Sequence, residues 1–154
     1  MGSEFVTETA RRLSEIRSSL PAGVQLLAVS KTHPVELIQE AYDAGQRLFG
    51  ENKVQEMVAK HAQLPEDIEW HFIGHVQRNK IRQMAPFVSV IQGIDSFESL
   101  QETDRQAARY GRSIRCLLQL HIASEETKFG FTPKECLEML EEMKWRELNH
   151  VIIA

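Results

Sequence analysis

Lys31 stands where a lysine side chain can act as a nucleophile. It comes directly after the apolar run 25–30, which predicts a buried strand, and shortly before Pro34, which favours the start of a helix. In parallel α/β folds the residues after the strands form the functional edge of the sheet. An apolar wall there would disfavour the charged ammonium and so favour the free amine that a Schiff base requires. The simpler alternative is a solvated lysine that closes a strand, and position alone favours that alternative.

Polar residues and glycines follow two further predicted strands. Asn52 comes after the second strand, and Gly74 and His75 come at the end of the third. Asn52 could hydrogen-bond a ring hydroxyl, and the missing side chains of Gly50 and Gly74 would let the backbone approach a flat ligand closely. Both glycines could equally relieve crowding at the corners of a barrel. We therefore predict a binding edge made of Lys31, Asn52, Gly74 and His75.

Alternating strands and helices are expected to position this edge. The predicted strands are 25–30, 47–50, 69–74, 88–94, 114–122 and 151–154, and helical patterns separate them after a leader helix that ends at Pro21. This order implies a parallel sheet, either doubly wound or closed into a barrel. The first strand is not followed by the Gly-x-Gly-x-x-Gly turn of dinucleotide-binding folds, so we favour the barrel.

Two helices have readable start signals. Thr132, Pro133 and Glu135 form a capping box with a hydroxyl N-cap, a proline at N1 and a glutamate at N3. The run 95–98 (DSFE) predicts a second such start, with Asp95 as the N-cap.

Composition and charge narrow the class of protein. The 154 residues are 42% hydrophobic and 26% charged, as in ordinary globular chains, and the net charge of -4 argues against a nucleic-acid partner. No apolar run approaches the roughly 18 residues that span a bilayer, so we expect no membrane partner and a cytoplasmic protein. We interpret Cys116 and Cys136 as buried free thiols. Residues 1–5 resemble a cloning remnant, which leaves 6–154 as a single domain.

Four motifs together resemble one known family. They are AVSKT at 28–32, FGENKVQE at 49–56, WHFIGHVQRNK at 70–80 and ETKFGF at 126–131. In this order and at this spacing, the chain is similar to the pyridoxal phosphate homeostasis proteins from its leader helix to its last residue.

The resemblance implies a (β/α)8 barrel of the type found in the N-terminal domain of alanine racemase, with about six β/α units present. It also implies that pyridoxal phosphate is held as an internal aldimine on Lys31, with Asn52 beside the cofactor ring and Lys128 as a secondary contact. Family members are regarded as carriers of the cofactor that have no established catalytic turnover.

This sequence departs from the family pattern after residue 154. Related chains continue into a serine- and glycine-containing phosphate loop, which is not present here. We therefore expect an incomplete barrel that binds pyridoxal phosphate weakly and, if the chain truly ends at Ala154, self-associates through its open sheet edges.

Three alternative functions remain open from the sequence. The first is a pyridoxal phosphate enzyme such as a racemase or lyase, which would need an acid/base group opposite Lys31; Tyr42 and Tyr110 are poor candidates because they fall on predicted helices. The second is an aldolase-like barrel that uses Lys31 directly on a carbonyl substrate. The third is a partial barrel without activity of its own.

Overall fold

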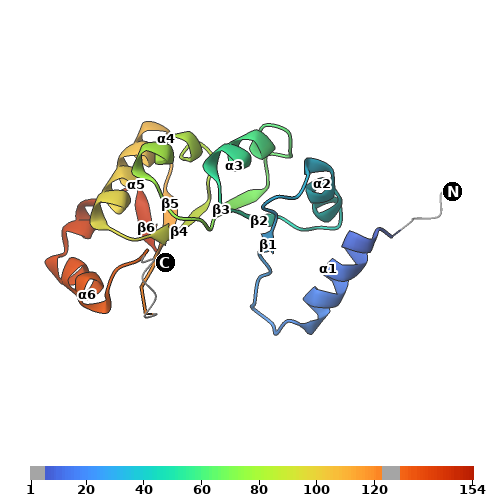
Figure 1. The fold of residues 1–154 in the computed structure, drawn as a ribbon, viewed down its shortest axis with the longest axis horizontal. Coiled ribbons are helices and arrows are strands. Elements are labelled where there is room, and N and C mark those ends of the chain that lie inside the picture. The colour runs from blue at the N-terminus through green and yellow to red at the C-terminus, as the bar shows by residue number, and fades with distance from the viewer. Residues whose placement is uncertain (1–5, 123–128) are drawn as a thin grey trace.

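A computed structural model describes residues 6–122 and 129–154, which contain one all-parallel sheet (Figure 1). Within these residues the strands are β1 (Ala28–Val29), β2 (Leu48–Glu51), β3 (Glu69–Phe72), β4 (Val90–Ile94), β5 (Ile114–Leu118) and β6 (Val151–Ile153). All six strands predicted from the sequence are confirmed. Five of them lie inside their predicted bounds, and β2 extends one residue further, to Glu51.

Helices connect the strands and cover one face of the sheet. Figure 1 shows α2 (Val35–Asp43), α3 (Val54–His61), α4 (Ile81–Met84) and α5 (Phe97–Arg109) in a row along one side of the strands. The leader helix α1 (Glu8–Ser19) packs beside α2, and α6 (Pro133–Glu142) comes between β5 and β6. The 3-10 helices η1 (Arg78–Lys80) and η2 (Lys144–Glu147) precede α4 and β6.

The order of the strands identifies the architecture. The strands lie in the spatial order β1-β2-β3-β4-β5-β6, and the colours of Figure 1 accordingly run along the long axis of the molecule. A doubly wound sheet would reverse its strand order at a switch point, whereas a (β/α)8 barrel adds each strand beside the previous one. The described residues therefore form six consecutive units of a barrel, as predicted.

The helix starts follow the capping rules, with one correction. Thr132 and Glu135 form the predicted capping box, in which the Thr132 hydroxyl accepts from the Glu135 N–H at 3.1 Å and the Glu135 carboxylate accepts from the Thr132 N–H at 3.1 Å. The prediction that Asp95 caps α5 is wrong. Ser96 is the N-cap, because its backbone is extended and its hydroxyl accepts from the Ser99 N–H at 3.1 Å.

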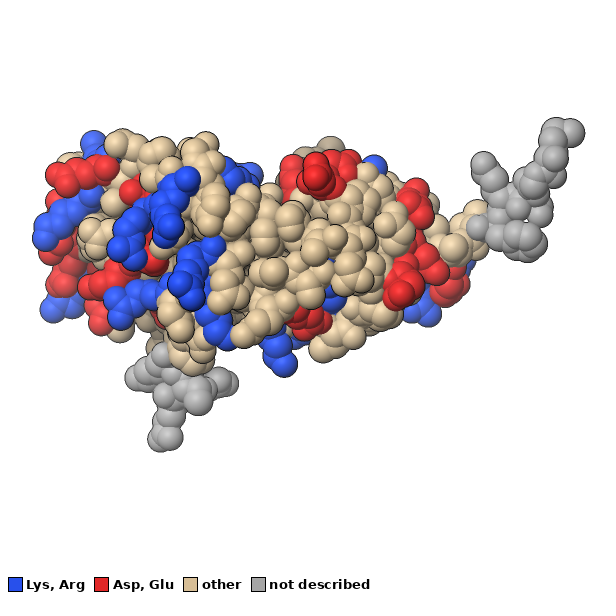
Figure 2. All heavy atoms as spheres, turned by 90° about the horizontal axis from the view of Figure 1, so that it is seen from above, with Lys and Arg blue, Asp and Glu red and all other residues tan. Residues whose placement is uncertain are grey.

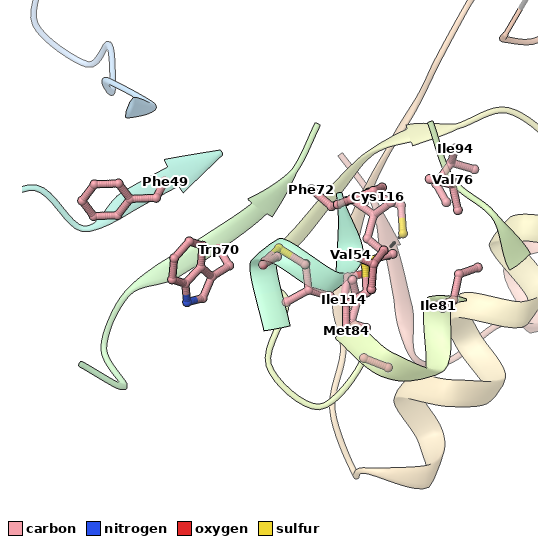
Figure 3. Packing of buried hydrophobic residues seen from close by; sticks show 14 of the residues in the cluster. Phe49, Val54, Trp70, Phe72, Val76, Ile81, Met84, Ile94, Ile114 and Cys116 are labelled. Atoms are coloured by element: carbon pink, nitrogen blue, oxygen red, sulfur yellow. Dashed lines mark hydrogen bonds between the residues drawn. The ribbon is translucent and has the colours of Figure 1, made fainter. Parts of the chain in front are cut away.

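The hydrophobic core lies between the sheet and the helix row. In Figure 3, Phe49 and Trp70 project from the neighbouring strands β2 and β3, with ring centroids 6.1 Å apart, and Phe72 continues this layer along β3. The same hydrophobic cluster contains Val54 of α3, Met84 of α4, and Ile114 and Cys116 of β5. Truncating a buried aromatic residue to alanine typically costs about 3–5 kcal/mol, so these rings hold the strands against the helices.

Local hydrogen bonds explain why two strands are shorter than predicted. The buried Gln46 side-chain amide donates to the Leu26 carbonyl at 2.7 Å and to the Leu48 carbonyl at 2.8 Å, and so takes the place of ladder bonds before β1. Beyond β5, Phe131 pairs with the backbone on both sides of Leu120: its N–H donates to the Gln119 carbonyl and its carbonyl accepts from the His121 N–H, each at 2.8 Å. These contacts end the strand at Leu118.

The helical face of the molecule carries charges of both signs. Figure 2 shows Lys and Arg interspersed with Asp and Glu toward one end, and a largely uncharged stretch in the middle. In the described part of the chain, no helix is both long and apolar enough to cross a membrane. The same residues contain no cluster of three or more potential metal ligands from His, Cys, Asp and Glu.

Candidate functional site at the carboxyl edge of the sheet

Lys31 lies in a tight turn that directly follows β1. The turn closes with a hydrogen bond from the His33 N–H to the Ser30 carbonyl at 3.1 Å. Thr32 has a φ of 66°, which is uncommon for any residue other than glycine and is unfavourable for a β-branched side chain. Positive φ at the third position is the property of a type II turn, which normally takes glycine there. Lys31 is exposed at this edge, which agrees with the solvated alternative and not with the apolar wall that the sequence suggested.

Asn52 lies level with Lys31, just after the neighbouring strand β2. Val29 is opposite Gly50 in the parallel register, and Lys31 and Asn52 each come two residues after that pair. The Ser30 N–H donates to the Gly50 carbonyl at 2.9 Å and continues the ladder to the edge of the sheet. The two predicted site residues are therefore brought to the same edge.

Gly74 packs directly against the backbone of Asn52. A β-carbon at Gly74 would overlap the Asn52 carbonyl oxygen and lie 2.9 Å from both the carbonyl carbon and the α-carbon of Asn52. A β-carbon at Gly93 of β4 would in turn lie 2.6 Å from the Gly74 carbonyl oxygen. The need for glycine at 74 thus comes from the close approach of neighbouring strand ends, which is the structural alternative that the sequence left open.

His75 shares a pocket with Asn52. The pocket, of about 350 Å³, is lined by both residues together with Phe72 and Lys80. The His75 ring stacks on Phe129 with centroids 3.7 Å apart, and its Nδ1 lies 3.6 Å from the Asp95 carboxylate. One face of the ring is therefore covered by Phe129, and Asp95, which does not cap α5, faces this histidine instead.

Lys128, the fifth predicted cofactor contact, lies outside the described residues, as do residues 1–5. The glycine that follows it in the motif, Gly130, has a φ of 132°. A β-carbon there would lie 2.8 Å from the His121 backbone nitrogen, so the chain comes back close to the end of β5 at this point.

A buried ionic cluster beneath the Lys31 turn was missed by sequence reasoning. The Lys60 ammonium lies 3.0 Å from both carboxylate oxygens of Glu51 and 2.9 Å from Glu56 Oε1. Glu51 is completely buried and also accepts a hydrogen bond from the Ser30 hydroxyl. One sequence signal pointed to it: Glu56 and Lys60 are four residues apart on α3, the spacing of a helical ion pair.

The electrostatics of this cluster favour the ionised carboxylate of Glu56. The hydrogen bond from Lys60, followed by the backbone N–H of Thr32, lowers the pKa of Glu56 below its ordinary value. In contrast, burial lowers the pKa of His71 on β3, whose Nδ1 lies 3.1 Å from the Gln92 side-chain amide. His71 is therefore held in its neutral form at the middle of the sheet.

The carboxyl-terminal ends of the parallel strands form one edge of the sheet, the carboxyl edge, and its side chains can bind or react with a ligand. It presents the exposed amine of Lys31 in a hydrogen-bonded turn, the Asn52 amide just after the adjacent strand and the His75 imidazole further along. A primary amine can add to an aldehyde carbonyl and form a covalent bond with loss of water. A ligand that carries an aldehyde therefore fits the Lys31 amine.

Comparison with known proteins identifies the family of the chain. The family model described as "Alanine racemase, N-terminal domain" matches residues 7–153. A pyridoxal phosphate homeostasis protein of Vibrio alginolyticus is 41% identical over 143 residues, covering 90% of this chain and 61% of that protein. The protein of the same name from Schizosaccharomyces pombe is 38% identical over 131 residues, covering 82% of this chain and 55% of that protein. The chain thus spans about three-fifths of the length of these relatives.

Solved structures show the same fold. PipY of Synechococcus elongatus with pyridoxal phosphate bound superimposes with a TM-score of 0.86 at 41% identity, covering 95% of this chain and 68% of that one. An alanine racemase of Clostridium difficile gives a TM-score of 0.75 at 15% identity, covering 95% of this chain and 38% of the other. At that identity the likeness concerns the fold alone.

Proposed function

This chain belongs to the alanine racemase N-terminal domain family and, within it, to the pyridoxal phosphate homeostasis proteins, and from this premise we propose that it binds pyridoxal phosphate covalently through Lys31. The observation that carries the proposal is the position of Lys31 at the carboxyl edge of a barrel sheet, where it is exposed in the hydrogen-bonded turn 30–33. When bound, the cofactor supplies an aldehyde that condenses with the lysine amine and releases water.

The neighbouring residues take supporting roles in this proposal. Asn52, level with Lys31, donates or accepts one hydrogen bond at the ring. His75 lines a pocket together with Asn52. Gly74 contributes by letting the Asn52 backbone sit close to its own. Lys128 stays a proposed secondary contact. In barrels of this type, phosphate groups are held after strands seven and eight, so the described edge accounts for the aldehyde and ring end of the ligand.

We favour a carrier of the cofactor over a racemase or lyase. Such an enzyme needs a second acid/base group facing Lys31. Tyr42 lies on α2, and its hydroxyl donates to Asp67 at 2.5 Å, just before β3 begins. Tyr110 ends α5, just before β5 begins. Both tyrosines therefore lie toward the amino-terminal edge of the sheet, opposite Lys31. The names of the relatives support a role in the homeostasis of the cofactor.

The proposed setting is the cytoplasm, with residues 6–154 acting as one domain. Cys116 and Cys136 are free and buried, which suits a reducing compartment. All six strands belong to one sheet, and one hydrophobic cluster contains residues from α1 to β6. Both observations support a single domain.

The test is attachment of pyridoxal phosphate to wild type, Lys31→Ala and Lys134→Ala, the last of which replaces an exposed lysine of α6. After reduction with borohydride, we expect a mass increase of one cofactor on the peptide that contains Lys31 in the wild type and in Lys134→Ala. The Lys31→Ala protein should show no such increase. Equal labelling of Lys31→Ala and the wild type would refute the assignment.

A further inference from the structure

The backbone on both sides of Lys31 is hydrogen-bonded to one ionic cluster, because the Ser30 carbonyl accepts from Lys60 and the Thr32 N–H donates to Glu56, an ionic partner of Lys60. We propose that Lys60 is a positioning residue for Lys31: together with Glu51 and Glu56 it fixes the turn 30–33, so that the amine of Lys31 is presented from a rigid backbone. The inference rests on the proposed function only in taking Lys31 as the residue that attaches the cofactor. The tie to the backbone itself is independent of any ligand.

The first tie acts on the residue before Lys31. The Lys60 Nζ donates to the Ser30 carbonyl at 2.8 Å, and the same carbonyl accepts the hydrogen bond from the His33 N–H that closes the turn. The Ser30 hydroxyl donates to Glu51, which is the buried partner of Lys60. Both the main chain and the side chain of Ser30 therefore belong to the cluster.

The second tie acts on the residue after Lys31. The Thr32 N–H donates to Glu56 Oε1 at 2.6 Å, and that same oxygen lies 2.9 Å from the Lys60 Nζ. Thr32 has its unfavourable φ of 66° at this point. A conformation of this kind persists only where the surroundings determine it, and the charged acceptor Glu56 provides that determination.

The buried cluster holds backbone groups while Lys31 itself stays exposed. The Ser30 hydroxyl donates to Glu51 of β2, and Glu51 in turn accepts from Lys60 of α3. Lys31 follows Ser30 in the turn and is exposed. The cluster therefore acts on the backbone on both sides of Lys31 and leaves its amine accessible.

Stability alone does not account for the cluster. Lys60 and Glu51 are both buried, and an apolar pair of similar volume is often as stable as a buried ion pair or more so. Directed hydrogen bonds, unlike apolar contacts, fix the direction in which a backbone group points. Lys60 donates to the Ser30 carbonyl, and Glu56, which also binds Lys60, accepts from the Thr32 N–H. These hydrogen bonds fix the direction of backbone groups on both sides of Lys31.

The decisive experiment measures the turn without any cofactor. Amide hydrogen exchange at Thr32 would be followed by NMR in wild type, in the charge-balanced double variant Glu51→Gln with Lys60→Met, in Glu56→Ala and in Glu56→Gln. Lys134→Met serves as the matched control for the loss of a lysine. The double variant leaves the Thr32 acceptor in place, so a change at Thr32 reports on Lys60 and Glu51 alone.

We expect the amide hydrogen of Thr32 to exchange about tenfold faster in the double variant and in Glu56→Ala. The reason is that these variants remove hydrogen bonds to charged groups, which hold the turn closed. Glu56→Gln keeps an oxygen that can accept from Thr32 and should restore most of the protection. The control should match the wild type. Wild-type protection of Thr32 in a folded double variant would overturn the proposal.

A second measurement connects the turn to the amine. The rate constant for attachment of pyridoxal phosphate to Lys31 should fall about tenfold in the double variant. Unfolding midpoints in urea, measured for the same proteins, show whether the variants are folded under the conditions of the assay. Lost attachment in the wild type, together with the expected Thr32 exchange, would refute the proposed function and leave the positioning of the turn supported. Normal attachment rates in variants whose Thr32 exchange has accelerated would refute the link to Lys31.

Discussion

The space that a side chain of Gly74 would occupy is filled by the backbone of Asn52. A β-carbon at 74 would lie 2.9 Å from the Asn52 α-carbon, a distance that real β-carbons do not show. Because Asn52 directly follows β2 and Gly74 follows β3, this contact sets how closely the two strand ends approach at the edge where Lys31 lies. A change at Gly74 should therefore affect both the fold and the site.

Gly74→Ala is expected to lower the free energy of unfolding by about 1–3 kcal/mol, because the added methyl group meets backbone that cannot rotate away. The measurement is urea unfolding followed by circular dichroism. Gly50→Ala is the matched control, since a β-carbon there lies 3.3 Å from the mobile end of the Ile73 side chain. The control should lose clearly less stability. If the two variants were equally stable, the Asn52 contact would not be the reason for glycine at 74.

Asn52→Ala should weaken the binding of pyridoxal phosphate without abolishing covalent attachment at Lys31. It removes one hydrogen bond at the ring, worth about 0.5–1.5 kcal/mol net, which corresponds to roughly a 2- to 13-fold higher Kd. Titration of the cofactor followed by its absorbance gives this number. An affinity equal to that of the wild type, with the same pH response, would make Asn52 a structural residue only.

The position of Lys31 could be predicted because a strand end is visible in sequence. The apolar run before Lys31 and the polar residues after two further runs indicated one edge of a parallel sheet, and the register between Val29 and Gly50 confirms that Lys31 and Asn52 lie on it. Their roles toward a cofactor remain predictions. The capping box at Thr132 was equally readable, because it depends on local spacing alone.

The role of Lys60 could not be predicted, because it depends on where α3 sits against β1. Its contact with Ser30 joins residues 30 positions apart, and nothing in a local pattern indicates this pairing. The early start of β1 was wrong for the same kind of reason, since the Gln46 side chain takes the Leu26 carbonyl across 20 positions. Asp95 was preferred over Ser96 as a cap because both types suit that position, and only the backbone angles decide between them.

Cys116 should resist thiol reagents in the folded protein. Burial in the core raises its pKa to about 12, so the reactive thiolate is scarce at pH 8. Native protein treated with iodoacetamide should leave the peptide containing Cys116 unmodified, whereas protein in urea should be modified fully. The Cys136→Ser variant isolates the signal of Cys116. Rapid labelling of Cys116 in native buffer would mean that β5 opens locally on the time scale of the reaction.

Acid should weaken the fold in part through Glu56. Its pKa in the folded protein is lowered, first by the hydrogen bond from Lys60 and then by the Thr32 N–H. For a carboxyl group of this kind the stabilisation is complete above its unfolded pKa of about 4.3, and it is lost as pH falls through the folded value. Glu56→Gln cannot lose a charge, so its free energy of unfolding should fall less steeply than that of the wild type below about pH 5.

Urea unfolding at a series of pH values from 7 to 3 would measure both slopes. Glu8 and Asp67, which also have lowered pKa values, are present in both proteins and so contribute equally to each curve. Glu138→Gln provides a surface control on α6, where Lys134 lies 3.8 Å away, and its curve should follow that of the wild type. Parallel curves for Glu56→Gln and the wild type would show that the Glu56 carboxylate does not hold the Lys31 turn in solution.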